Sequence, residues 1–197
     1  MPKLLFSSTS PYSAKVRMAA AYAGIKLDEA IVDTASQPAE LLKANPLGKI
    51  PVLITDDGVS VYDSRVITQY LNRVGGGLFP RNAEKRTDAE GLEALSDGIA
   101  DCLLAHVYER RSRPEEMVHQ PWLDKQWAKA VRALDHVNAN PPKLGKKANA
   151  GHIALRSTLA YLDLRFPGKW EKGRGKLGRW AERFDKKFPD LKAFLPS

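Results

Sequence analysis

The stretch KLLFSSTSPYSAKVRMAAAYAGIKLDEAIV, residues 3–32, decides how this chain begins to fold. Residues 3–6 form a short apolar run typical of a buried strand, and residues 27–32 form a second one. Between them, Ser10 and Pro11 indicate a helix start, because serine caps a helix well and proline suits its first position. The apolar residues that follow recur on one helical face until a glycine ends the pattern. A strand, a helix and a strand in about thirty residues predict a right-handed βαβ unit.

The following part of the chain predicts one more helix, a hairpin and another helix. Residues 38–44 carry a weak helical pattern. The apolar runs 51–55 and 59–61 flank Asp-Asp-Gly at 56–58, and an Asp-Gly pair in this setting is typical of a β-hairpin. The next helix is predicted to begin at residues 63–64, with five apolar residues on its buried side: Val66, Ile67, Tyr70, Leu71 and Val74. This order predicts an α+β domain with a four-stranded mixed sheet.

A glycine-rich break divides the chain. Residues 75–81 begin with three glycines, which is typical of a linker. Beyond it the apolar residues step by three and four, a spacing that predicts four or five amphipathic helices and no strand. The sequence therefore predicts two domains, residues 1–77 and residues 83–197, the second an all-α helical bundle.

The composition excludes several classes of protein. The chain has 197 residues, of which 43% are hydrophobic and 27% charged, values typical of a globular protein and not of a disordered one. Its single cysteine, Cys102, excludes a disulfide framework or a cysteine-rich zinc site, and its four histidines lack metal-ligand spacing, so we expect no metal. No apolar stretch resembles a signal peptide or a membrane span, so we expect a cytoplasmic protein with no membrane partner.

The net charge of +8 is unevenly distributed. Residues 1–138 hold 17 basic and 18 acidic residues, whereas residues 139–197 hold 14 basic and 5 acidic ones. A basic segment can bind nucleic acid, but no nucleic-acid-binding motif accompanies this one. We therefore favour a solvated basic face on the last helices over a nucleic-acid partner.

Three positions in the first domain are candidates for ligand binding. Ser10 lies among several hydroxyl residues at a helix start, where backbone N–H groups and the helix dipole favour an anion such as a thiolate. Ile50-Pro51 precedes a strand, and a cis proline there would present the Ile50 backbone to a ligand, although trans is the ordinary form. Asp63 and Ser64 begin a helix and could hold an ammonium and a carboxylate. Each position is also compatible with a purely structural role, as a helix cap or a turn.

These positions lie in three segments, SPYSAKVR (10–17), NPLGKIPVL (45–53) and DSRVITQYL (63–71), that resemble the successive signatures of the cytosolic glutathione S-transferases. With the helical second half, the resemblance covers nearly the whole chain, and short bacterial members of serine type are the most similar. It implies a thioredoxin-like first domain with Pro51 in the cis form, glutathione as co-substrate and a homodimer.

The resemblance also implies roles for individual residues. Ser10 would stabilise the glutathione thiolate as the catalytic residue, with Thr9 and Tyr12 as alternatives. Asp101, or else Asp97, would reach the γ-glutamyl amine across a dimer interface. The implied glutathione-binding residues are Gln37, Lys49, Ile50, Pro51, Asp63 and Ser64, and the implied electrophile pocket is Tyr12, His106, Tyr108 and Arg111.

This chain departs from the family pattern at two positions, and each departure limits which family properties can be expected of it. Tyr12 stands where cysteine-type bacterial members have their cysteine, so a mixed disulfide with the protein's own thiol is not expected there. Asn149 begins a helix of the second domain without the carboxylate that normally completes its capping box. The expected function is conjugation of glutathione to small electrophiles, with glutathione-dependent peroxidase activity as a candidate side activity. The alternative is a non-catalytic, transferase-like binding or regulatory module.

Overall fold

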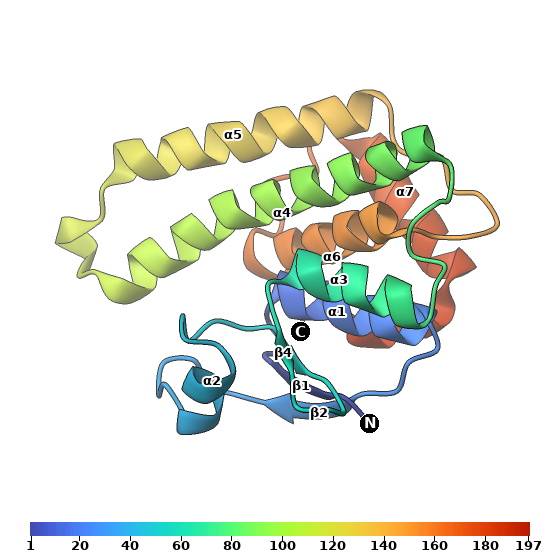
Figure 1. Ribbon diagram of the computed structural model, residues 1–197. Coiled ribbons are helices and arrows are strands. Elements are labelled where there is room, and N and C mark those ends of the chain that lie inside the picture. Colours follow the sequence, from blue (N-terminus) through green and yellow to red (C-terminus); the bar gives the residue numbers. More distant parts are fainter.

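The predicted βαβ unit is confirmed in a computed structural model that describes residues 1–197 (Figure 1). Strand β1 (Lys3–Phe6) pairs in parallel with β2 (Asp28–Ile31), with Lys3 opposite Asp28. Helix α1 (Pro11–Tyr22) connects them, and the Ser10 side chain caps it by accepting a hydrogen bond from the Ser13 amide.

The predicted hairpin completes a four-stranded mixed sheet. Strands β3 (Val52–Ile54) and β4 (Ser60–Val61) are antiparallel, and β3 also pairs antiparallel with β1, so the order across the sheet is β2-β1-β3-β4. The short helix α2 (Ala39–Ala44) precedes β3, and α3 (Ser64–Val74) follows β4. The prediction of a four-stranded α+β layer with helices is therefore confirmed.

The prediction for the buried face of α3 is wrong at two positions. Val66 and Val74 are 47% and 61% exposed, whereas Ile67 and Leu71 are fully buried. The inward face also carries a polar residue, Thr68, whose hydroxyl donates a hydrogen bond to Glu93 on a neighbouring helix. Because α3 packs through this narrow, partly polar stripe, the flanking valines point to the surface.

The second half of the chain is entirely helical, as predicted. Figure 1 shows α6 lying between α1 and α4, with α5 on the far side of α4. The elements are α4 (Ala83–Ser112), the 3₁₀ helix η1 (Glu115–Met117), α5 (Gln120–Ala139), α6 (Ala150–Arg165), α7 (Gly175–Lys187) and the 3₁₀ helix η2 (Pro189–Phe194). None of these helices is long and apolar enough to cross a membrane.

Helix α6 packs very closely against α4. A Cβ atom at Gly151 would lie 2.6 Å from the Ala89 carbonyl oxygen and 2.9 Å from Leu92 Cβ, both too close for any side chain. Asn149 caps α6 by accepting a hydrogen bond from the His152 amide at 2.9 Å, even without the partner carboxylate. Glycine at position 151 therefore sets the spacing of the two helices.

One hydrophobic core runs through both halves of the chain. A single cluster of 30 buried residues extends from Leu4 in the sheet to Leu191 in η2. Hydrogen bonds also cross between the halves, including one that the Ser157 hydroxyl donates to the Pro11 carbonyl at 2.6 Å. Because the core is continuous, the division into domains 1–77 and 83–197 stays a prediction.

The basic excess of the last third lies on the surface. Helix α7 buries Leu177, Trp180 and Phe184, while its basic side chains are exposed. Two arginines of this region are buried instead and form ion pairs, Arg156 with Asp185 and Arg174 with Asp135. The burial pattern agrees with the interpretation of the last helices as a solvated basic face around an apolar stripe.

A buried ionic cluster joins the sheet half to the helical half. Lys15 in α1 is 1% exposed, and its Nζ lies 2.9 and 2.8 Å from the two carboxylate oxygens of Asp97 and 3.1 Å from Glu93 Oε1. Arg65 Nε lies 3.3 Å from Asp97 Oδ2, so two cations balance two carboxylates. Burial raises the pKa of Asp97, and Lys15 opposes that change. We call Lys15, Arg65, Glu93 and Asp97 the junction cluster.

The first prediction concerns this cluster. Lys15→Met leaves two buried carboxylates without their shared ammonium, so the free energy of unfolding should fall by about 3 kcal/mol in denaturant titrations. Lys3→Met is the matched control, because the ion pair of Lys3 with Glu40 is open to solvent and its loss should change the free energy of unfolding far less. Equal losses in the two variants would contradict a structural role for the buried pair.

The second prediction concerns pH. Burial lowers the pKa of His152 to about 4, and its Nδ1 has no hydrogen-bond partner. The unfolded chain takes up a proton on this histidine below about pH 6.5, whereas the folded chain does so only near pH 4. Stability should therefore fall as the pH is lowered through this window, by about 2 to 3 kcal/mol from this group. His152→Leu should flatten that part of the profile, and the exposed-site control His136→Leu should retain it.

Candidate active site

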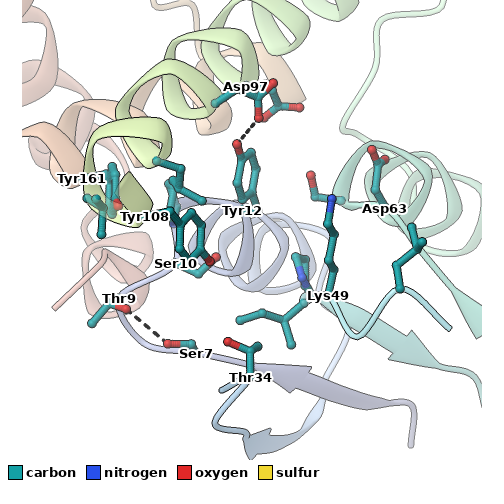
Figure 2. Close-up of a pocket in the computed structure, with 18 of the residues that line it drawn as sticks. Ser7, Thr9, Ser10, Tyr12, Thr34, Lys49, Asp63, Asp97, Tyr108 and Tyr161 are labelled. Atoms are coloured by element: carbon teal, nitrogen blue, oxygen red, sulfur yellow. Dashed lines mark hydrogen bonds between the residues drawn. The ribbon is translucent and has the colours of Figure 1, made fainter. Parts of the chain in front are cut away.

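A cavity of about 660 Å³ opens where the sheet half meets the helical half (Figure 2). This volume lies within the range of ordinary ligand-binding pockets. Its walls come from the loop after β1, the start of α1, the loop before β3, the start of α3, and the helices α4 and α6. In Figure 2, Asp63 and Lys49 lie on one side, Tyr108 and Tyr161 on the other, and Tyr12 between them.

Ser10 stands at the start of α1, half-buried in the cavity wall. Its Oγ accepts a hydrogen bond from the Ser13 amide at 3.2 Å, and that bond leaves its own hydroxyl proton available to a ligand. The positive end of the helix dipole lies at the same place. This position is therefore suited to hold a negatively charged atom.

The two alternative hydroxyls beside Ser10 are already engaged with the protein. The Thr9 hydroxyl shares a hydrogen bond of 3.2 Å with the Ser7 hydroxyl, in which either oxygen can donate. The Tyr12 hydroxyl donates a short hydrogen bond to Asp101 of the same chain. Burial, followed by that hydrogen bond, raises the pKa of Tyr12, so the phenol stays protonated. In this structure Asp101 thus faces Tyr12.

The loop before β3 is shaped by its own polar contacts. The buried Asn45 side chain donates to the Lys49 carbonyl at 2.8 Å and accepts from the Leu47 amide at 3.0 Å. Gly48 has φ of 60°, in the left-handed region that favours glycine. The Ile50–Pro51 peptide bond is cis, as the family resemblance implied. The pairing of β1 with β3 ends at Val52, so Ile50 lies just beyond the sheet, in the cavity wall.

The start of α3 forms the adjacent part of the wall. Asp63 caps the helix by accepting from the Arg65 amide at 3.0 Å, and Ser64 is buried beside it. Arg65 reaches back to Asp97 in the junction cluster. A carboxylate, a hydroxyl and the positive end of a helix dipole therefore meet at one place, which suits a ligand that carries both an ammonium and a carboxylate.

The opposite wall is formed by α4 and α6. Leu104, Ala105 and Val107 make it partly apolar, and Tyr108 is 48% exposed beside them. Arg111 lies near the end of α4, and Tyr161 and Arg165 lie toward the end of α6. This wall has an apolar body with two cationic side chains at its rim.

Two residues that the sequence placed in the site do not line the cavity. Gln37 is exposed in the loop before α2. The His106 ring packs instead against Trp127 and Phe166, at centroid distances of 5.9 and 5.8 Å. Cys102 is also absent from the cavity wall, and burial raises the pKa of its thiol. No group of three or more His, Cys, Asp or Glu side chains is arranged to hold a metal ion.

Several residues of the wall were missed by sequence analysis. They include Thr34 after β2 and Tyr161 and Arg165 on α6. Helix α6 is apolar on most sides and buried along most of its length, so its pattern does not show which face meets the first half of the chain. Lys15, which does not line the cavity, was also missed, although its place four residues before Ala19 puts it on the apolar face of its helix.

A family model and a curated relative of this chain point to the same family. The family model for the glutathione S-transferase N-terminal domain matches residues 9–74. The uncharacterized GST-like protein YibF of Escherichia coli is 30% identical over 170 residues, which cover 83% of each chain.

Solved structures match over the full length. A glutathione S-transferase from Methylobacillus flagellatus KT, crystallised with GSH bound, is 35% identical and superposes with a TM-score of 0.90 over 100% of both chains. A glutathione transferase family member from Pseudomonas fluorescens Pf-5, with bound glutathione, is 33% identical with a TM-score of 0.90, again over 100% of both chains. These similarities show that this protein belongs to the glutathione S-transferase family.

Proposed function

We propose that this chain binds glutathione in the cavity and transfers its thiolate to small electrophiles. The observation that carries the proposal is that Ser10, the Ile50–Pro51 peptide and the Asp63–Ser64 pair line one cavity. These positions come from three separate loops of the sheet half. A purely structural role for each would not require them to face the same space.

Glutathione would lie along the sheet side of this cavity. Its γ-glutamyl ammonium would meet the Asp63 carboxylate, and its γ-glutamyl carboxylate would meet Ser64 and the start of α3. The cysteinyl backbone would pair with Ile50 in the manner of an added strand. The exposed ammonium of Lys49 would bind the glycine carboxylate. We prefer Lys49 to Gln37 for this role, because Gln37 does not line the cavity.

The sulfur would then lie at the start of α1. An ordinary thiol is mostly protonated at neutral pH, so the site has to favour the thiolate. Ser10 can donate a hydrogen bond to the sulfur, and the α1 dipole adds to that effect. We prefer Ser10 over Thr9 and Tyr12, because the latter two already form hydrogen bonds to Ser7 and Asp101. The thiol proton leaves to water on binding, so no separate base is needed.

The electrophile would be held between Tyr12 and the wall formed by α4 and α6. A bound thiolate that attacks an electrophilic carbon forms a thioether while the bond from that carbon to its leaving group breaks and the leaving group departs with the bonding pair. Reduction of a peroxide would begin from attack of the same thiolate on the peroxide oxygen, with cleavage of the oxygen–oxygen bond. The peroxidase activity and the homodimer that the resemblance implies stay predictions.

The third prediction tests glutathione binding itself. Calorimetric titration should give saturable binding, and Ser64→Ala should weaken it about tenfold, because one hydrogen bond to a charged group is lost. Ser36→Ala, in an exposed loop outside the cavity, is the matched control and should leave the affinity unchanged. No saturable binding at millimolar glutathione would contradict the proposal and favour a non-catalytic binding module.

The fourth prediction tests the role of Ser10. Ser10→Ala should still bind glutathione but raise the pKa of the bound thiol by about 1 to 2 pH units, because it removes a hydrogen bond to the thiolate. The pKa is measured from the ultraviolet absorbance of the thiolate, and turnover of a chloronitrobenzene at neutral pH should fall in parallel.

Two controls separate this effect from others. Asn82→Ala removes the side-chain cap of α4 and shows what the loss of a helix cap alone does. Thr9→Val tests the competing hydroxyl. If Thr9→Val raises the thiol pKa and Ser10→Ala does not, the catalytic role belongs to Thr9.

A further inference from the structure

Two arginines at one end of the cavity have no acidic partner. Arg111 and Arg165 both line the wall formed by α4 and α6, and neither lies within 4.0 Å of a carboxylate, whereas Arg65 on the other side of the cavity pairs with Asp97. Two guanidinium groups beside one space repel each other and attract anions. The absence of a protein partner for either group leaves that attraction available to a ligand.

The surroundings of both arginines favour a positive charge. The Arg111 guanidinium carbon lies 5.6 Å from the centre of the Tyr108 ring, a cation–π contact. Arg165 is the last residue of α6, where the helix dipole favours a positive charge. Burial raises the pKa of the Tyr161 phenol, and the positive charges of Arg165 and Arg111 oppose that change, so both act on the same side chain. The two cations therefore converge on the region around Tyr161.

The acidic residues of the cavity are committed elsewhere. Asp97 is held by Lys15 and Arg65, Asp101 accepts from the Tyr12 hydroxyl, and Asp63 caps α3. The part of the wall near Tyr108 and Tyr161 is therefore positively charged. The side chains of Leu104 and Val107 in α4 give it an apolar body.

We propose that the electrophile of this transferase carries a carboxylate at the end remote from its reacting carbon, and that Arg111 and Arg165 bind that carboxylate. The inference rests on the proposed glutathione transfer and adds a substrate class to it. A planar guanidinium matches the geometry of a carboxylate and can donate two parallel hydrogen bonds to it. The apolar part of the substrate would lie against Leu104 and Val107, with its reactive carbon toward Ser10.

A pair of benzyl bromides tests this inference directly. The probes are 4-(bromomethyl)benzoate and its methyl ester, which share the reacting carbon and differ in the remote charge. In both, the glutathione sulfur forms a bond to the benzylic carbon, the carbon–bromine bond breaks, and bromide leaves with the bonding pair. Dividing each kcat/KM by the uncatalysed rate constant removes the difference in intrinsic reactivity.

We expect the corrected kcat/KM of the wild-type protein to be about tenfold higher for the benzoate than for the ester, because only the benzoate can accept charge-assisted hydrogen bonds from the arginines. Arg111→Gln and Arg165→Gln should each reduce that preference, and the double variant should bring it to within about twofold. Turnover of the ester is measured in all three variants, because the preference is the ratio of the two corrected kcat/KM values. Arg110→Gln is the matched control, because Arg110 is the exposed neighbour of Arg111 outside the cavity, and it should keep the full preference.

The outcomes separate the inference from the proposed function. If neither bromide is turned over and glutathione does not bind, the proposed function fails. If both are turned over without preference, or if the preference survives in the double variant, the inference is overturned while the transferase function stands. A rise in KM for glutathione with both bromides would also overturn it, because the arginines would then hold glutathione. Loss of the preference in Arg110→Gln would show a general charge effect and overturn it as well.

Discussion

The buried ammonium of Lys15 is the constraint on which the arrangement of this protein depends. A buried charge costs several kcal/mol unless it is paired, so α1 has to meet α4 where Glu93 and Asp97 lie one helical turn apart. The start of α1 carries Ser10 and Tyr12, while α4 carries the opposite wall of the cavity. The two walls are therefore placed by the ion pairs of Lys15, and one of its partners, Asp97, also lines the cavity.

The cavity has opposite chemical character at its two ends. Asp63, Ser64 and the start of α3 can receive a zwitterionic group, whereas Arg111 and Arg165 attract an anion. The start of α1 lies between them and suits a negatively charged atom. Two substrates can therefore bind end to end, one with its zwitterionic group at α3 and the other with its anionic group at the arginines. Their reacting atoms would then meet in the middle of the cavity. Position, more than any strong acid or base, is what this arrangement supplies.

The sequence predicted what depends on local pattern and turn chemistry. The βαβ unit, the hairpin and the caps at Ser10 and Asp63 follow from short-range rules and are confirmed. The inward face of each helix was harder to predict, because it depends on which elements the helix packs against. Val66 and Val74 are exposed since α3 packs through Thr68 and Ile67, and His106 turns toward Trp127 and away from the cavity. Tyr161 and Arg165 lie on a helix with too little polarity to show its orientation.

The close contact at Gly151 limits how such a site can evolve. There is no room for a side chain between α4 and α6 there, so any substitution at this position would force the two backbones to shift. New substrate preferences would therefore arise at the other ends of these two helices, where Tyr108, Arg111 and Arg165 are exposed. Saturation mutagenesis of those three positions samples specificity while leaving the scaffold intact, and libraries that vary residue 151 would mostly yield unfolded protein.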